Sequence, residues 1–166
     1  MEQNTHPANQ IQHRGEKYLT FSLCGEEYGI EILKLKEIIG MTIITSVPQT
    51  PEFVKGVINL RGKVMPVVDL RLRFGMEAAV YTARTCIIIV EIAAESGRVV
   101  IGIVVDAVSE VIHIKAEDIE AAPEFGGSMN TRYILGMAKV DGNVKILLDI
   151  DHVLSREDKA LLERAA

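Results

Sequence analysis

Residues 54–70 read VKGVINLRGKVMPVVDL, with valine, isoleucine and leucine on both sides of an Arg-Gly pair. Runs of β-branched residues favour strands, and a glycine that adopts positive φ suits a short turn between them. The stretch therefore predicts a β-hairpin with its turn at Arg61-Gly62. Pro66 lies inside the second strand, which predicts a sheet edge or a bulge because proline has no N–H to donate.

The same frame recurs near the end of the chain, where residues 134–150 read ILGMAKVDGNVKILLDI and place a turn at Asp141-Gly142. A second similarity precedes it: Gly29-Ile30 followed by Glu37 recurs as Gly102-Ile103 followed by Glu110 at the same internal spacing. Two repeats in the same order predict two similar half-domains.

Short strands at close spacing, tight turns and the repeat predict an all-β protein with short helices, built as two small β-barrels packed together. We expect a disordered tail over 1–17, a first barrel over about 18–76 and a second over about 84–150. The segment 33–39 fits a short helix or a strand, and 42–47 fits a strand. A capping box at Ser155 predicts a C-terminal helix within 151–166.

Charge and composition exclude several classes of partner. The net charge of −5 and the aromatic content of 5% argue against nucleic acid or an anionic membrane, which favour clustered cations and stacking rings. Without an apolar run of membrane-spanning length or a signal segment, the chain is expected to be cytoplasmic. Cys24 and Cys86 lie in strand-like runs and are expected to be small buried side chains rather than disulfide or metal ligands.

We find no phosphate-binding glycine loop, zinc-protease helix or nucleophile elbow in the sequence, and the histidines do not cluster. The sequence therefore predicts no catalytic residue, cofactor or metal, and a protein that is not an enzyme. Asp69 and Asp149 occupy equivalent repeat positions. Helix capping is the favoured interpretation and a carboxylate pair the alternative.

The two halves differ at position 61, where the second half has Asp141. An Asp-Gly pair satisfies such a turn by itself, so the turn does not require Arg61. This arginine is either solvated or a recognition group for a carboxylate or carbonyl, and Glu37 is placed to hold it by an ion pair. Phe125, in a loop between Pro123 and two glycines, is either a plug on the local core or an anchor for a partner.

Five stretches together resemble the CheW family of bacterial chemotaxis coupling proteins: EYGIEILK at 27–34, FVKGVINLRG at 53–62, VMPVVDL at 64–70, VIGIVVDAVSEV at 100–111 and APEF at 122–125. The resemblance runs from about Tyr18 to Glu163. It implies a domain over 18–150 with two SH3-like five-stranded barrels around a shared hydrophobic core. It also implies a cytoplasmic adaptor, recruited to membrane-associated receptor arrays without inserting in the membrane. The adaptor would join the cytoplasmic tips of methyl-accepting chemotaxis proteins to the regulatory domain of the histidine kinase CheA.

By position, the resemblance implies a receptor-binding face and a kinase-binding face. The receptor-binding residues would be Leu35, Glu37, Ile38, Gly56, Arg61, Cys86, Ile87, Gly102 and Val108. The kinase-binding residues would be Ile44, Thr45, Gly62 and Val64 of the first barrel and Phe125 of the second. The family generally has valine at Leu35 and Cys86.

Four alternatives stand beside this interpretation. They are an adaptor in a non-flagellar chemosensory pathway, a small-molecule enzyme with a site between the barrels, a nucleic-acid module, and a CheW-like piece of a larger protein.

Overall fold

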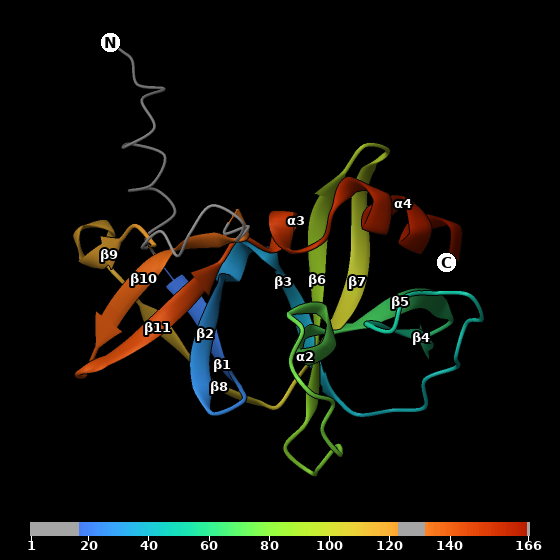
Figure 1. Ribbon diagram of the computed structural model, residues 1–166, viewed down its shortest axis with the longest axis horizontal. Coiled ribbons are helices and arrows are strands. Elements are labelled where there is room, and N and C mark those ends of the chain that lie inside the picture. The colour runs from blue at the N-terminus through green and yellow to red at the C-terminus, as the bar shows by residue number, and fades with distance from the viewer. Residues whose placement is uncertain (1–16, 123–131, 166) are drawn as a thin grey trace.

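The computed structural model describes residues 17–122 and 132–165, which form two curled β-sheets with a few short helices (Figure 1). The six-stranded sheet has the order β8-β1-β2-β11-β10-β9 and the five-stranded sheet the order β3-β6-β7-β5-β4. The strands are β1 Lys17–Leu23, β2 Glu26–Glu31, β3 Leu35–Gly40, β4 Val54–Leu60, β5 Lys63–Asp69, β6 Cys86–Ala94, β7 Gly97–Val105, β8 Ala107–His113, β9 Ile119–Glu120, β10 Ile134–Val140 and β11 Asn143–Leu148. The helices are η1 Ile32–Lys34, α2 Leu70–Arg73, η2 Ala116–Asp118, α3 Ile150–Val153 and α4 Arg156–Ala165. The predicted all-β class with short helices and a C-terminal helix is confirmed.

Each sheet combines strands from both halves of the sequence. β1 and β2 pair with β8 and β11 in one sheet, and β6 and β7 lie between β3 and β5 in the other. The sheets therefore do not coincide with the contiguous barrels expected at 18–76 and 84–150. β2 and β7 are equivalent strands of the repeat, with the same apolar pattern and an equivalent glycine, Gly29 or Gly102. The sequence pattern therefore does not distinguish that β2 will pair with β11 and β7 with β5.

This exchange of strands between the two halves of the sequence follows an internal two-fold repeat, and the repeat extends to single hydrogen bonds. The Asp69 N–H donates to the Phe53 carbonyl at 2.8 Å, and in the second half the equivalent Asp149 N–H donates to the Tyr133 carbonyl at 2.7 Å. Both hairpins also have a register shift at the equivalent place, just before Gly56 in one and just before the matching glycine of β10 in the other. The predicted repeat is thus visible in the backbone itself.

The hairpin at 54–70 forms as predicted, with Leu60 opposite Lys63 across the turn. β5 is internal rather than an edge, and a register shift lies in its pairing with β4. Pro66 is opposite Val57, whose N–H and carbonyl both bond to Thr45 at 2.9 Å. Because Val57 turns these groups away from β5, proline at 66 breaks no hydrogen bond between β4 and β5.

Three local expectations need correction or completion. Segment 42–47 is not a strand, and only Thr45 makes an isolated bridge, to Val57. Segment 33–39 is both of the alternatives in turn, with η1 ending at Lys34 before β3 begins. Cys24 is exposed because it lies in the β1–β2 turn with φ of +51°, whereas Cys86 is half-buried; both are free thiols.

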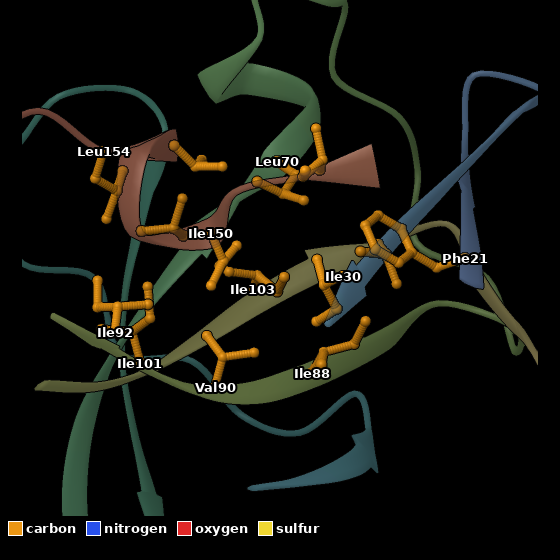
Figure 2. Packing of buried hydrophobic residues seen from close by; sticks show 14 of the residues in the cluster. Phe21, Ile30, Leu70, Ile88, Val90, Ile92, Ile101, Ile103, Ile150 and Leu154 are labelled. Carbon is orange, nitrogen blue, oxygen red and sulfur yellow. The ribbon is translucent and has the colours of Figure 1, made fainter. Parts of the chain in front are cut away.

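A shared core lies between the sheets. Side chains from both sheets and from α2 and α3 converge on it in Figure 2, including Phe21, Ile30, Leu70, Ile88 and Ile150. Each of these is at most 2% exposed. Burying such a side chain stabilises the folded state by about 1.5–3 kcal/mol. The apolar contacts of this cluster are therefore the main stabilisation of the exchanged strands.

The short helices begin at side-chain caps. Asp69 accepts a hydrogen bond from the Leu72 N–H at 3.4 Å, and Asp149 accepts one from the Asp151 N–H at 3.1 Å. Ser155 and Asp158 form the predicted reciprocal capping box at the start of α4. Across the described parts of the chain, no helix combines the length and apolar character that crossing a bilayer requires.

Candidate functional site

The tip of the β4–β5 hairpin presents an arginine in an unusual backbone conformation. Arg61 has φ of +54° and Gly62 has φ of +85°, the geometry of a tight hairpin turn. The left-handed region costs a non-glycine residue about 1–2 kcal/mol. At the equivalent turn the cost is carried by Asp141, with φ of +53°, a residue type that tolerates this region better. The backbone conformation at position 61 is therefore unfavourable for an arginine.

The predicted ion pair between Arg61 and Glu37 is present. Arg61 Nη1 lies 3.4 Å from Glu37 Oε1, and Nη2 donates to Oε2. This hydrogen bond and the carboxylate charge raise the pKa of Arg61 above its ordinary value. The arginine side chain remains 70% exposed, so donors that do not face Glu37 are open to a partner.

The other predicted receptor-binding residues fall into different environments. Leu35, Cys86 and Val108 are half-buried and pack against the shared core, while Ile38 lies opposite Ile88 and is 39% exposed. Val108 belongs to the six-stranded sheet and the other three to the five-stranded sheet. This set therefore spans the seam between the sheets.

Three of the predicted receptor-binding residues are buried and have evident structural roles. Ile87 is 0% exposed in the cluster inside the five-stranded sheet. A Cβ on Gly56 would lie 2.0 Å from the Thr45 carbonyl oxygen, and one on Gly102 would lie 2.7 Å from Ile87 Cγ2. The two glycines are thus required by close packing, which is sufficient reason for their presence.

The predicted kinase-binding residues of the first barrel lie along the β4–β5 hairpin and along the segment 41–53 that crosses it. Thr45 bonds to β4, Ile44 packs against the inner cluster, and Gly62 and Val64 are exposed at the turn and on β5. Phe125 lies outside the described residues.

Sequence reasoning missed Ile43, which is 86% exposed next to Ile44. The segment was expected to be a strand, in which Ile43 and Ile44 would point to opposite faces of a sheet. The segment ends directly before Pro48, and Pro51 follows three residues later. These two prolines were the available signal for an irregular segment. Ile43 and the half-exposed Val64 are apolar side chains that the structure leaves accessible to a partner.

The second half repeats the exposed valine but not the arginine. Val144 and Val64 are 49% and 50% exposed at equivalent positions. Glu110 and Asp141 take the places of Glu37 and Arg61, and neither carboxylate has a hydrogen-bond or ion-pair partner within residues 17–122 and 132–165. The two hairpin tips therefore offer different charge to a partner.

The structure supports the capping interpretation of the paired aspartates. Besides its cap bond, Asp69 accepts a hydrogen bond from the Tyr81 hydroxyl at 2.9 Å, and burial together with this bond raises the pKa of Tyr81. Asp149 lies 2.8 Å from His152 Nδ1. Each aspartate is committed to its own helix.

The described part of the chain holds no cluster of three or more His, Cys, Asp or Glu side chains that could bind a metal ion. A pocket of about 670 Å³ lies between α4 and the end of the β6–β7 hairpin. Its lining mixes both signs of charge, and several groups bond to one another: Arg156 to Glu95, and Lys159 to the Asp151 carbonyl.

Comparison with known proteins places this architecture in a family. A family model described as a CheW-like domain matches residues 17–158. The chemotaxis protein CheW of Klebsiella aerogenes is 42% identical over 152 residues, covering 92% of this chain and 89% of that protein. The chemotaxis protein CheW of Rhizobium meliloti is 32% identical over 155 residues, covering 93% and 97%.

A solved structure agrees with the sequence comparisons. The scaffolding protein TtCheW from Thermoanaerobacter tengcongensis matches with a TM-score of 0.75 at 38% identity, covering 87% of this chain and 95% of that one. The family model and the relatives each span most of the chain, so the match is to the whole fold. This chain is a member of the CheW family of chemotaxis scaffold proteins.

Proposed function

We propose that this protein is a non-enzymatic cytoplasmic adaptor that couples chemoreceptor tips in membrane-associated arrays to the histidine kinase CheA. The observation that carries the proposal is Arg61, an exposed arginine held in a left-handed turn and oriented by Glu37. A guanidinium of this kind recognises carboxylate or carbonyl groups on a partner. Family membership supports the same assignment.

On the receptor side, the cytoplasmic tip of a methyl-accepting chemotaxis protein binds over Arg61, Glu37 and Ile38. The half-buried Leu35, Cys86 and Val108 supply apolar surface at the seam between the sheets. Leucine and cysteine at positions where the family generally has valine keep this surface apolar and alter its shape, which bears on the choice of receptor.

On the kinase side, the regulatory domain of CheA binds the β4–β5 hairpin and the segment before it, over Ile44, Thr45, Gly62 and Val64. Ile43 extends this face because it is exposed beside Ile44. Phe125 is the proposed kinase contact of the second barrel. Signalling is then a coupling free energy of about 1–3 kcal/mol between the two partners, gained without a bond-making step. Repetition of these interfaces in an array strengthens them through effective concentration.

Reconstitution of kinase activity tests the proposal. CheA and receptor cytoplasmic fragments are assembled with and without this protein, and autophosphorylation is measured. We expect receptor control of the kinase only when the protein is present. Kinase activity that responds to receptor equally well without it, or binding to neither component, would refute the adaptor function. To distinguish the non-flagellar alternative, the assay is repeated with the receptors and the kinase of each chemosensory pathway that the source cell contains.

A further inference from the structure

Two partly buried carboxylates join the sheets to each other through equivalent backbone positions. In the first junction, Asp106 Oδ2 accepts a hydrogen bond from the Cys24 N–H at 2.9 Å, and Arg71 donates to both Asp106 oxygens at 2.7 and 2.6 Å. In the second junction, Asp151 Oδ1 accepts from the Ala93 N–H at 2.9 Å and Oδ2 from Lys34 Nζ at 2.7 Å.

The two junctions are related by the internal repeat, in which Ile39 of β3 corresponds to Ile112 of β8. Tyr18 lies opposite Ile112 in the six-stranded sheet, as Ile87 lies opposite Ile39 in the five-stranded sheet. β1 therefore corresponds to β6. Counting along both strands from these paired residues makes the N–H at position 24 equivalent to the N–H at position 93. A carboxylate thus meets the same backbone group in both halves.

The polarity of the two junctions is inverted. Arg71 and Asp151 occupy equivalent positions, each the second residue of its helix, α2 or α3, yet one is a cation and the other an anion. The opposite charge comes in each case from the connection that crosses between the sheets, Asp106 between β7 and β8 and Lys34 between β2 and β3. Each junction therefore links three segments: a short helix, a connection that crosses between the sheets, and a hairpin. These segments come from both sheets.

The side chains are buried enough for these bonds to matter. The exposed fractions are 19% for Arg71 and 29% for Asp106, and 30% for Lys34 and 22% for Asp151. α4 reinforces the second junction, because Lys159 Nζ donates to the carbonyls of Ala93 and Asp151, each at 2.6 Å. Bonds that involve a charged partner contribute more than neutral ones in such surroundings.

We propose that the two junctions are positioning elements, which hold the two sheets in the relative orientation that receptor binding requires. This inference rests on the proposed adaptor function. The link is geometric: Val108 lies on the six-stranded sheet and Leu35 and Cys86 on the five-stranded sheet, so a rotation of one sheet against the other reshapes the receptor face. The inverted polarity also means that either sign pattern serves, provided that a carboxylate reaches the hairpin N–H.

Charge inversion at the first junction tests the proposal in the full-length chain. Arg71→Asp alone places two carboxylates together, whereas Arg71→Asp with Asp106→Arg copies the polarity of the second junction. We measure affinity for a receptor cytoplasmic fragment, and amide exchange at Cys24 by NMR. The single variant is expected to bind about fivefold or more weakly, with faster exchange at Cys24. The double variant is expected to recover both.

The matched control is Arg98→Met, which removes an exposed ion pair to Glu91, 3.1 Å long, between β6 and β7 of one sheet. It is expected to leave affinity and exchange unchanged. If Arg71→Asp does not fold, Asp106→Asn and Lys34→Met are measured instead, with the same weakening expected.

A double variant no better than the single one, or single variants with unchanged receptor affinity, would overturn the positioning role. If the unmodified protein does not bind the receptor fragment, the adaptor function fails and the role proposed for the junctions in receptor binding fails with it. The recovery of slow Cys24 exchange in the double variant still decides whether inverted polarity restores the junction.

Discussion

At the scale of single residues, the proposed function depends most on Arg61. The turn geometry alone favours asparagine, aspartate or glycine at this position, and the equivalent turn has Asp141. Arginine instead places a charged, oriented group at the tip, so its removal is expected to affect binding more than folding.

Arg61→Asn is expected to weaken binding to a receptor cytoplasmic fragment by about tenfold, because the guanidinium is lost while asparagine tolerates positive φ. Isothermal titration calorimetry measures the affinity, and thermal unfolding verifies that the fold is intact. Asp141→Asn, at the equivalent turn without an arginine, is the matched control. Equal affinity of Arg61→Asn and the unmodified protein would leave this arginine a solvated side chain.

Ile43→Ser is expected to weaken binding to the CheA regulatory domain, since the isoleucine is 86% exposed in the free protein and gains burial only in a complex. Its effect on the free energy of unfolding should stay within about 0.5 kcal/mol, as is usual for exposed positions. Val80→Ser, at an 89% exposed valine in the connection between α2 and β6, is the control. A loss of stability with unchanged kinase affinity would contradict the assignment of Ile43 to the kinase face.

At the scale of elements, the hairpins and helix caps were predictable because each is decided within a few residues. Turn glycines, the Asp69 cap and the Ser155 capping box are local signals, and the structure contains all of them. The segment 41–53 was not predictable, since its path is set by a contact distant in sequence, the approach of Thr45 to Gly56. Of the candidate site, the sequence predicted the Glu37–Arg61 pair and not the exposure of Ile43.

Gly56→Ala tests that approach against Gly62→Ala on the same hairpin. A Cβ at Gly56 would meet the Thr45 carbonyl oxygen at 2.0 Å, whereas a Cβ at Gly62 meets nothing within 4 Å. Both glycines have positive φ, +143° at Gly56 and +85° at Gly62, so both variants carry backbone strain of about 1–3 kcal/mol. Urea unfolding is expected to show a further loss of about 2 kcal/mol or more for Gly56→Ala only. Similar losses in the two variants would mean that Thr45 yields without cost.

At the scale of the whole molecule, the fold is one core shared by two interleaved sheets. The repeat was readable in the sequence, but the exchange of β1 and β2 against β6 and β7 was not, because equivalent strands have equivalent patterns. What distinguishes the halves is charge: Arg61 against Asp141 at the tips, and the inverted polarity of the junctions. These differences allow one repeated scaffold to present unlike faces.

The junctions also predict how stability depends on pH. The bond from Arg71, with that from the Cys24 N–H, lowers the pKa of Asp106 below 3.8. Burial alone would raise the pKa of Asp151, but the bonds from Lys34 and the Ala93 N–H lower it. Because the unfolded chain then binds more protons, stability rises with pH between the folded and unfolded pKa values. The contribution is complete above about pH 5 and lost as pH falls below about 4.

Asp106→Asn is therefore expected to lower the free energy of unfolding at neutral pH by about 1–3 kcal/mol and to flatten its fall below about pH 4. Urea unfolding across this pH range measures both effects, with Asp141→Asn as the control at an exposed carboxylate. Parallel curves for Asp106→Asn and the unmodified protein would contradict an ionised junction.

The central claim is that one molecule couples two partners, and thermodynamic linkage tests it most directly. The affinity of this protein for the CheA regulatory domain is measured with and without a saturating receptor cytoplasmic fragment. The account predicts that the dissociation constant changes by about 5–150-fold, and that the kinase changes receptor affinity by the same factor. An affinity for the kinase domain that is identical in both conditions would contradict it.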